Sequence, residues 1–340
     1  MKKVIRMTDF VLDGSLSAGE SKSTEETGAD EKKTYDLIII GGGVVGGAAL
    51  MYAGRLGMKV LMIGETLGGT IILTDTVENY PGFKKLTGKE LADRILEHAK
   101  EYPVEIEEDR VKSVRKLESG CFEVKTFQKT FKAKSILFAT GTKHRKLNVP
   151  GSEEFENRGV HYCALCDGYF YKDKVVAVVG GGDSAAKEAL ILAEHASKVY
   201  IIARGDHLKA EPINRKRVEE NPKIEVILKT NVTEIFGDKT VTGVKLDNPY
   251  NGKDILELSA VFVEIGQIPQ TELAKELGVE LNAKGEIIID RDSKTNMEGV
   301  FAAGDCVNSS FKQAIVGVGE AVVAVYSAYN YVGSREISCD

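Results

Sequence analysis

One local pattern occurs twice in the chain: an apolar strand, a glycine-rich turn, a helix and a second apolar strand. The first copy starts with YDLIII at residues 35–40, continues through GGGVVGG and a helix of about 44–56, and ends with KVLMI before Glu65. The second copy, residues 174–206, runs from KVVAVV through GGGDSAA to KVYIIARGD. Continuous apolar runs of strand length that open into glycines are typical of buried parallel strands. The chain is therefore expected to be an α/β protein.

The glycines of both copies have the spacing of a dinucleotide-binding loop. In G-x-G-x-x-G/A, the small residues permit a tight turn, close approach of a pyrophosphate to a helix N-terminus, and packing of the helix on the strand. The alternative is a turn that only allows close packing. An acidic residue about 20 positions after the first loop, Glu65, could accept from a ribose hydroxyl. The loop residues are Gly41, Gly43 and Gly46 in the first copy, and Gly180, Gly182, Asp183, Ser184 and Ala185 in the second. We therefore expect two Rossmann-like three-layer domains that bind two dinucleotides.

The order of these segments predicts that one domain is inserted into the other. The segment SILFATGTKHRKLNVPG marks a boundary between the two copies, and the chain after about residue 268 has no third phosphate loop. It does have a predicted strand, EIIID, the segment GVFAAGDC and an apolar helix of about 317–331, which could complete the first domain. The expected divisions are a mobile extension at 1–33, a first domain at 34–148 and 268–334, and a second domain at 149–267.

Composition narrows the classes of partner. The 340 residues are 43% hydrophobic and carry a formal net charge of -6, which disfavours binding to nucleic acid. No apolar run reaches the roughly 18 to 20 residues of a membrane helix, and no apolar segment follows the basic N-terminus as in a secretory signal. We expect a cytoplasmic protein that binds no membrane.

Two of the five cysteines, Cys163 and Cys166, form a C-x-x-C motif. A zinc site would need about four ligands, and a single neighbouring histidine, His161, does not supply a second pair. A static bridge is a second alternative, but a reducing cytosol favours a redox-active dithiol. Asp167 could exchange a proton with a thiolate, or could only cap a turn. Cys121, Cys306 and Cys339 are interpreted as packing or incidental residues.

Several ordered motifs carry a resemblance to a known family. The segments VENYPG, FATGT, CALCDG, GGGDSA, FAAGDC and KQA, between about residues 34 and 332, resemble those of the low-molecular-weight thioredoxin reductases. The resemblance implies FAD in the first domain, a pyridine nucleotide in the second, and a homodimer. It also implies that electrons pass from NADPH through FAD and the Cys163–Cys166 dithiol to thioredoxin or a thioredoxin-like protein. The second domain would have to rotate, because both the dithiol and the nicotinamide must reach the flavin.

The resemblance also implies which residues contact FAD. Asn79 would lie beside the flavin, Asp305 would hold the ribitol chain, and the backbone of the K-Q-A segment would lie against the ring. Two of the family's residues are replaced, a glutamine by Thr70 and an arginine by Lys312, and Leu165 stands where the family often has threonine. The implied FAD contacts are Gly41, Gly43, Gly46, Glu65, Thr70, Asn79, Thr140, Gly141, Gly304, Asp305, Lys312, Gln313 and Ala314.

The electron donor is the least determined feature. Family members that use NADPH carry H-R-R-x-x-x-R after the second nucleotide strand, whereas this chain has Ala203-Arg204-Gly205 and Lys209. An NAD site would place an acidic residue where Ala203 stands. Arg204 and Lys209 could still hold the 2′-phosphate of NADPH, while NADH or another donor stays open. Two rival functions are a flavin-bound redox sensor and a ferredoxin-type flavin reductase with a non-nicotinamide donor, although the latter would need no dithiol.

Overall fold

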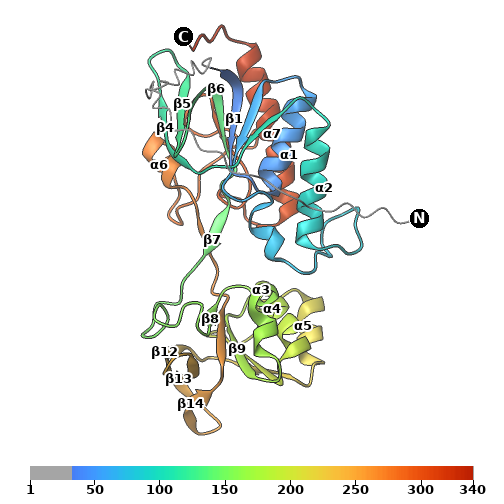
Figure 1. Ribbon diagram of the computed structural model, residues 1–340, viewed down its shortest axis with the longest axis vertical. Coiled ribbons are helices and arrows are strands. Elements are labelled where there is room, and N and C mark those ends of the chain that lie inside the picture. Colours follow the sequence, from blue (N-terminus) through green and yellow to red (C-terminus); the bar gives the residue numbers. More distant parts are fainter. Residues whose placement is uncertain (1–32, 340) are drawn as a thin grey trace, which may run out of the picture. The chain divides into compact units, whose positions relative to one another are not determined.

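The computed structural model describes residues 33–339, which fold around two sheets whose central strands are parallel (Figure 1). The mobile extension expected at residues 1–33 lies outside the described residues, apart from Lys33. In both sheets the strand that precedes a glycine loop lies between later parallel strands, as in a Rossmann fold. The predicted α/β class is confirmed.

The first sheet has seven strands in the order β3-β2-β1-β6-β5-β4, with β17 also paired to β6. The strands β1, β2, β3, β6 and β17 are mutually parallel, whereas β4 and β5 continue from β6 as an antiparallel meander. Strand β6 is long enough to pair with β5 through its first half and with β17 through its second half. The bounds are β1 Thr34–Ile40, β2 Val60–Ile63, β3 Glu105–Glu107, β4 Val111–Lys116, β5 Phe122–Thr126, β6 Thr130–Phe138 and β17 Val300–Ala302.

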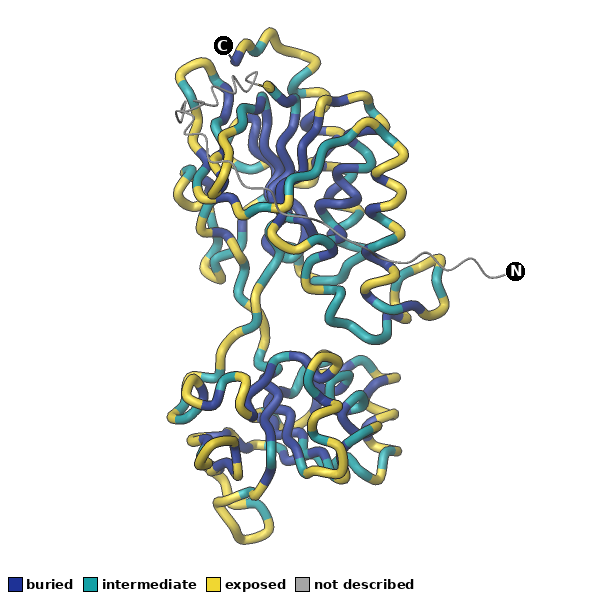
Figure 2. Tube along the Cα trace, viewed as in Figure 1, coloured by how far each residue is buried: buried dark blue, intermediate teal, exposed yellow. Residues whose placement is uncertain are grey.

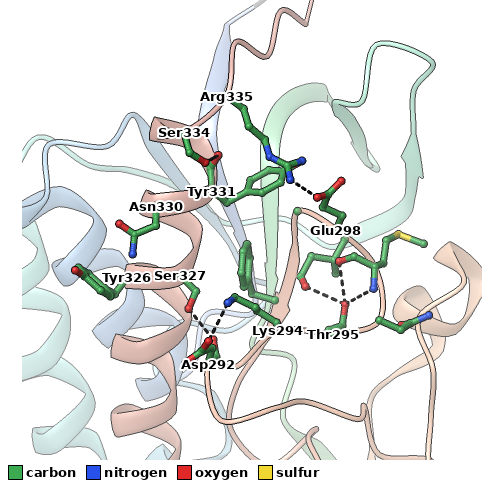
Figure 3. Close-up of a pocket in the computed structure, with 15 residues that line it drawn as sticks. Asp292, Lys294, Thr295, Glu298, Tyr326, Ser327, Asn330, Tyr331, Ser334 and Arg335 are labelled. Atoms are coloured by element: carbon green, nitrogen blue, oxygen red, sulfur yellow. Dashed lines mark hydrogen bonds and ion pairs between the residues drawn. The ribbon is translucent and has the colours of Figure 1, made fainter.

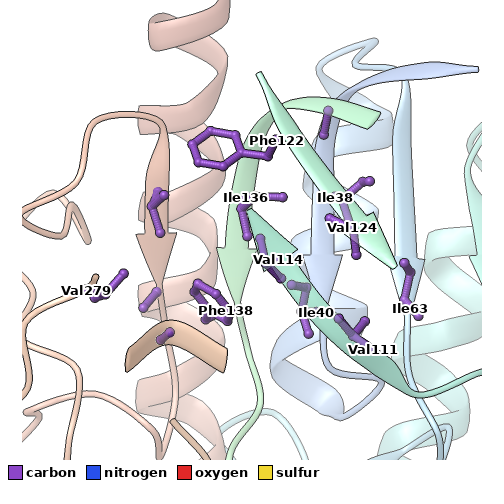
Figure 4. Packing of buried hydrophobic residues seen from close by; sticks show 14 of the residues in the cluster. Ile38, Ile40, Ile63, Val111, Val114, Phe122, Val124, Ile136, Phe138 and Val279 are labelled. Carbon is purple, nitrogen blue, oxygen red and sulfur yellow. The ribbon is translucent and has the colours of Figure 1, made fainter. Parts of the chain in front are cut away.

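Alternate residues of the parallel strands face two different layers. Ile38 and Ile40 of β1 belong to a core cluster with Phe122 and Val124 of the meander (Figure 4). Leu37 and Ile39 face the other way and pack with three helices, α1 (Val44–Arg55), α2 (Gly88–Lys100) and α7 (Ala314–Gly333). This alternation follows from the two-residue period of a strand and produces the three layers.

The C-terminal helix α7 starts earlier than the predicted 317–331. Its length and composition alone would allow it to cross a membrane, which is weak evidence because core helices pass the same test. Ala321, Ala324, Val325 and Ala328 are fully buried in the core cluster that α1 shares. Their small side chains at helical spacing explain why α7 packs on the sheet.

The second sheet is entirely parallel, in the order β11-β10-β9-β15-β8. One of its faces packs on α3, α4 and α5, and the other on a three-stranded antiparallel sheet, β12-β13-β14. Buried residues are concentrated in the strands of both large sheets (Figure 2). The bounds are β8 Val160–His161, α3 Ala164–Asp167, β9 Val175–Val179, α4 Asp183–His195, β10 Lys198–Ile202, α5 Pro212–Glu219, β11 Ile224–Ile227, β12 Val232–Gly237, β13 Val241–Tyr250, β14 Lys253–Glu257 and β15 Ala260–Val263.

A two-stranded antiparallel ribbon, β7 (Thr142–His144) paired with β16 (Gln267–Pro269), joins the two sheets along the chain. The chain leaves the first sheet after β6 through β7, and returns from the second sheet after β15 through β16. A glycine with positive φ precedes each strand, Gly141 at 61° and Gly266 at 100°. The remaining short helices are η1 (Gly69–Leu73), η2 (Gly168–Tyr171) and α6 (Glu272–Leu277).

Two sequence-based expectations are wrong. The segment EIIID, residues 286–290, forms only isolated bridges of Ile287 to Leu281 and Val307. The side chains of Asn282 and Asn308 accept from the backbone N–H groups of Glu286 and Ile289, in place of a continuous strand ladder. Cys121 and Cys339 are not incidental: they form a disulfide between residues 218 positions apart, and both are buried. The C-terminal segment is therefore fastened to the start of β5.

Candidate active site

The first glycine loop, between β1 and α1, has the close contacts that require glycine. Gly41 has φ +126°, and a Cβ there would lie 2.1 Å from the carbonyl oxygen of Ala139. A Cβ on Gly46 would lie 1.9 Å from the carbonyl oxygen of Gly41. Gly43 has ordinary contacts only, which leaves its face of the loop accessible. The loop therefore combines tight packing behind with an open approach to the start of α1.

A cavity of about 1120 Å³ opens beside this loop. Gly46 and Gly304 do not line it and instead serve packing: Gly304 has φ +86°, and its N–H donates to Glu320 Oε2 at 2.9 Å. The predicted contacts that line the cavity are Gly41, Gly43, Glu65, Thr70, Asn79, Thr140, Gly141, Asp305, Lys312, Gln313 and Ala314. The fold thus gathers residues from distant parts of the chain around one space.

Two of these residues meet directly. Asn79 Nδ2 donates to Gln313 Oε1 at 2.8 Å, although the residues are 234 positions apart. Lys312 is engaged by Glu286, with Nζ 3.0 Å from Oε1, and by the carbonyl of Val307. Burial raises the pKa of Asp305, while Lys312 opposes the shift. Lys312 therefore adds positive charge at this edge while remaining tied to the protein.

Sequence reasoning missed several lining residues. Arg110, Lys112 and Phe127 line the cavity, and Arg110 Nε lies 3.9 Å from Glu65 Oε2. Gln270 also lines it, and its amide donates to the carbonyl of Thr140 at 2.9 Å. None of these residues belongs to a motif with a fixed spacing, so only the folded chain identifies them.

The second glycine loop, between β9 and α4, repeats the arrangement of the first. Gly180 has φ +155°, and a Cβ there would lie 2.1 Å from the carbonyl oxygen of Glu264, whereas a Cβ on Gly182 would meet open space. Ala185 is fully buried and Ser184 is exposed. This loop therefore also has one packed side and one open side.

Near the second loop, Asp183 is bonded within the protein, whereas the basic side chains are exposed. Asp183 Oδ1 accepts from Glu211 N and Asn214 Nδ2, each at 2.9 Å, so this carboxylate is used within the protein. The Lys209 N–H donates to the carbonyl of Gly181 at 2.7 Å, which fastens the 203–209 segment beside the loop. The side chains of Arg204 and Lys209 are exposed there.

The C-x-x-C residues form a disulfide at the start of α3, beside the second sheet. Cys163 is buried, at 7% exposure, while Cys166 is exposed. The Cys166 N–H donates to Cys163 Sγ at 3.1 Å. Asp167 follows directly, and its Oδ2 lies 3.1 Å from Nδ1 of the buried His161. Asp167 is the carboxyl residue adjacent in sequence to the exposed Cys166, and proton exchange with a thiol requires such a group within reach of the sulfur.

Two largely buried carboxyl groups in the same sheet unit as the dithiol were not predicted. Glu188 on α4 accepts a hydrogen bond from the backbone N–H of Ala164, and burial raises its pKa to about 7. Burial and the neighbouring Glu188 raise the pKa of Glu264 to about 8. The sequence signal was weak, because Glu188 is one of several charged residues on an ordinary amphipathic helix.

A second cavity, of about 640 Å³, lies between the C-terminal part of α7 and residues 292–301 (Figure 3). Several of its polar side chains are already paired: Ser327 Oγ donates to the carbonyl of Asp292 at 2.8 Å, and Arg335 bonds Glu298. Neither glycine loop nor the dithiol lines it. The larger cavity and the dithiol together are therefore the candidate active site.

Residues 35–321 match the model of the pyridine nucleotide-disulphide oxidoreductase family. The chain belongs to this family. Membership accounts for the two glycine loops and a disulfide in one chain, and it implies FAD and a nicotinamide donor.

Relatives within this oxidoreductase family include thioredoxin reductases. The thioredoxin reductase of Listeria innocua is 40% identical over 308 residues, which cover 89% of this chain and 96% of the relative. The NADH dehydrogenase of Bacillus subtilis is 35% identical over 93% of this chain, which spans 62% of that longer protein. The structure of Lactococcus lactis thioredoxin reductase matches with a TM-score of 0.85 at 36% identity, covering 88% of this chain and all of that one.

Proposed function

We propose that this oxidoreductase is a flavin-dependent thioredoxin reductase. It would take electrons from a reduced nicotinamide and pass them to the disulfide of thioredoxin or a thioredoxin-like protein. The observation that carries the proposal is the Cys163–Cys166 disulfide, with Asp167 beside it, in the same sheet unit as the second glycine loop. Similarity to thioredoxin reductases along nearly the whole length of both chains supports it.

The residues around the larger cavity fit FAD. The glycine loop offers an open approach to the start of α1 for a pyrophosphate, and the cavity volume suits a ligand larger than a mononucleotide. We assign the remaining contacts as the resemblance implies, with Asp305 at the ribitol chain and the paired Asn79 and Gln313 beside the ring. When bound, FAD would supply two-electron transfer between the nicotinamide and the disulfide.

The protein's own residues would carry the dithiol chemistry. Two electrons and two protons convert the Cys163–Cys166 disulfide into two thiols, and Asp167 is placed to hold one of the protons. One thiolate then attacks the partner's disulfide and forms a mixed disulfide, which the second thiol resolves. The products are the partner's dithiol and the restored Cys163–Cys166 bond.

Exposed apolar side chains next to the dithiol suit a protein partner. Tyr169 is 69% exposed, Phe170 is 76% exposed and Leu165 is 40% exposed. All three lie within four residues of Cys166. Such a patch would dock a protein whose own disulfide is surrounded by apolar surface.

We propose NADPH as the donor at the second glycine loop, with NADH or another donor as the alternative. The exposed Arg204 and Lys209 supply positive charge beside that loop, where the 2′-phosphate of NADPH would require it.

Three further features belong to the same proposal. Residues 34–148 with 268–334 would form the FAD-binding domain, and residues 149–267 the domain for the nicotinamide. The ribbon of β7 and β16 would be the hinge about which the second domain rotates. We place the enzyme in the cytoplasm as a homodimer.

Turnover tests the proposed function directly. The purified flavoprotein is mixed with NADPH, or separately with NADH, and an oxidised bacterial thioredoxin, and free thiols are counted over time. We expect catalytic formation of two thiols for each nicotinamide consumed. A protein that binds FAD but reduces thioredoxin with neither nucleotide would contradict the proposal. In that case a redox sensor, or a reductase with a non-nicotinamide donor, would account for the fold.

A further inference from the structure

A buried histidine lies directly behind the catalytic carboxyl group. His161, the last residue of β8, is 6% exposed, and its ring stacks on Phe262 of β15 with the centroids 5.4 Å apart. Its Nε2 lies 2.7 Å from the hydroxyl of Tyr171, and its Nδ1 lies 3.1 Å from Asp167 Oδ2. The histidine thus connects a tyrosine in η2 with the aspartate that follows Cys166.

The surroundings determine which ring nitrogen carries the proton. Burial lowers the pKa of His161, although Asp167 opposes the shift, so the ring is neutral at neutral pH. Burial raises the pKa of Tyr171, so its hydroxyl stays protonated and can donate to Nε2. A neutral imidazole has one donor and one acceptor. With Nε2 accepting, Nδ1 carries the hydrogen and faces Asp167.

The contact with Asp167 is close but not yet a formed hydrogen bond. Nδ1 is buried and has no aligned hydrogen-bond partner among residues 33–339, although Asp167 Oδ2 is within reach. The side chain of Asp167 is 32% exposed, so it has room to rotate into line. Catalytic hydrogen bonds are commonly misaligned before the reacting state forms.

We propose that His161 is a positioning residue for Asp167 in the disulfide chemistry, with Tyr171 fixing the tautomer that this role requires. The inference rests on the proposed function. In exchange with the partner, the Asp167 carboxylate takes the proton of the thiol that attacks, and gives it to the thiolate that leaves the partner's disulfide. The Nδ1–H of His161 donates to the Asp167 carboxylate and holds it in line.

Other groups that face this cluster are few. Phe262 from β15 is apolar, and the only further acid coupled to Asp167 is Glu188 from α4, among the described residues. Because Glu188 also titrates near neutral pH, the pH dependence is measured in parallel in a Glu188→Gln background. A change that survives in that background belongs to the His161 cluster.

The test measures thiol–disulfide exchange between the reduced protein and oxidised thioredoxin, so that neither the electron donor nor the flavin takes part. Each variant is reduced with dithiothreitol, freed of it and mixed rapidly with oxidised bacterial thioredoxin across a pH series. His161→Leu removes both ring nitrogens, Tyr171→Phe removes only the hydroxyl, and His161→Asn keeps a donor near the position of Nδ1. Tyr162→Phe is the matched control, since it removes a hydroxyl from the adjacent residue, whose ring lies near His144.

We expect His161→Leu to slow exchange about tenfold. His161→Asn should recover most of the rate, Tyr171→Phe should fall between, and Tyr162→Phe should match the wild type. Unchanged rates in His161→Leu would overturn the inference. The inference would also be overturned if His161→Leu and His161→Asn lose the same amount of exchange rate and both losses merely parallel a lower melting temperature. The proposed function fails separately, if Cys163→Ser and Cys166→Ser variants still reduce thioredoxin.

Discussion

Glu188 and Glu264 are the residues whose ionisation depends most clearly on the fold. Both carboxyl groups are buried near each other, which raises their pKa values to about 7 and about 8 from an ordinary value of 4.5. The folded protein therefore keeps protons that the unfolded chain releases above about pH 4.5. The free energy of unfolding should decrease as the pH rises from that value through 8.

Neutral substitutions test this dependence. We predict that Glu188→Gln flattens the fall in unfolding free energy between about pH 5 and pH 8 by roughly 2–3 kcal/mol. Urea unfolding at several pH values provides the measurement, and Glu194→Gln, an exposed position on the same helix, is the control. If the unfolding free energy changes with pH in the same way in the wild type, Glu188→Gln and Glu194→Gln, Glu188 is ionised over the whole pH range.

The proposed donor preference can be tested at single residues. If NADPH is the donor, Arg204→Glu and Lys209→Glu should each raise its KM about tenfold, because a repulsive charge replaces an attractive one beside the 2′-phosphate. The KM for NADH should change little, and Lys216→Glu, an exposed position on α5, should change neither. Equal effects on both nucleotides would place Arg204 and Lys209 away from the 2′-phosphate.

Sequence reasoning reached the residues whose role is local. Gly41 and Gly180 were identified because a turn with positive φ between a strand and a helix leaves a spacing pattern. The Asn79–Gln313 bond and the approach of Glu188 to Ala164 depend on which elements become neighbours, which spacing does not encode. The same limit explains the Cys121–Cys339 disulfide, since nothing near Cys121 in the sequence indicates a partner 218 residues away.

At the scale of elements, α7 presents two different faces. Small residues are buried against the sheet, whereas Val323, Tyr326 and Tyr329 are exposed at intervals of three residues and so share one side of the helix. Exposed aromatic residues in a row are typical of a surface that another protein covers. This face is the candidate contact of the proposed homodimer.

Charge on this face should disrupt the dimer. We predict that Tyr326→Glu shifts the protein toward monomers in light scattering, because a carboxylate would be buried without a partner. Ile255→Glu, at an exposed apolar position on β14, should leave the mass unchanged. A wild-type protein that is already monomeric, or a Tyr326→Glu variant that remains dimeric, would exclude α7 as the interface.

In its oxidised form, the molecule is held together partly by its second disulfide. The Cys121–Cys339 bond closes a loop over most of the described chain, and the Cys339 carbonyl also accepts from Lys132 Nζ at 2.7 Å. Long loops give the largest reduction in the entropy of the unfolded chain. The bond should therefore stabilise the first sheet without taking part in turnover.

Removal of the Cys121–Cys339 bond should lower the stability of the protein only in oxidising buffer, where the bond can form. We predict that Cys339→Ser loses about 2–4 kcal/mol of stability, with a melting temperature lower by several degrees. Dithiothreitol should erase the difference from the wild type. Cys306→Ser alters a buried free thiol and keeps the disulfide, so its melting temperature should differ from that of the wild type by the same amount in both buffers. If Cys339→Ser and the wild type melt together in oxidising buffer, the bond contributes no stability.

The central claim is that electrons leave the molecule through Cys163 and Cys166. The most direct measurement is steady-state reduction of oxidised thioredoxin by the wild type and by Cys163→Ser and Cys166→Ser variants, with FAD content and donor-dependent flavin bleaching recorded for each. We predict that both variants bind FAD and are bleached by the same donor as the wild type, yet reduce no thioredoxin. Continued turnover by both variants would contradict this route.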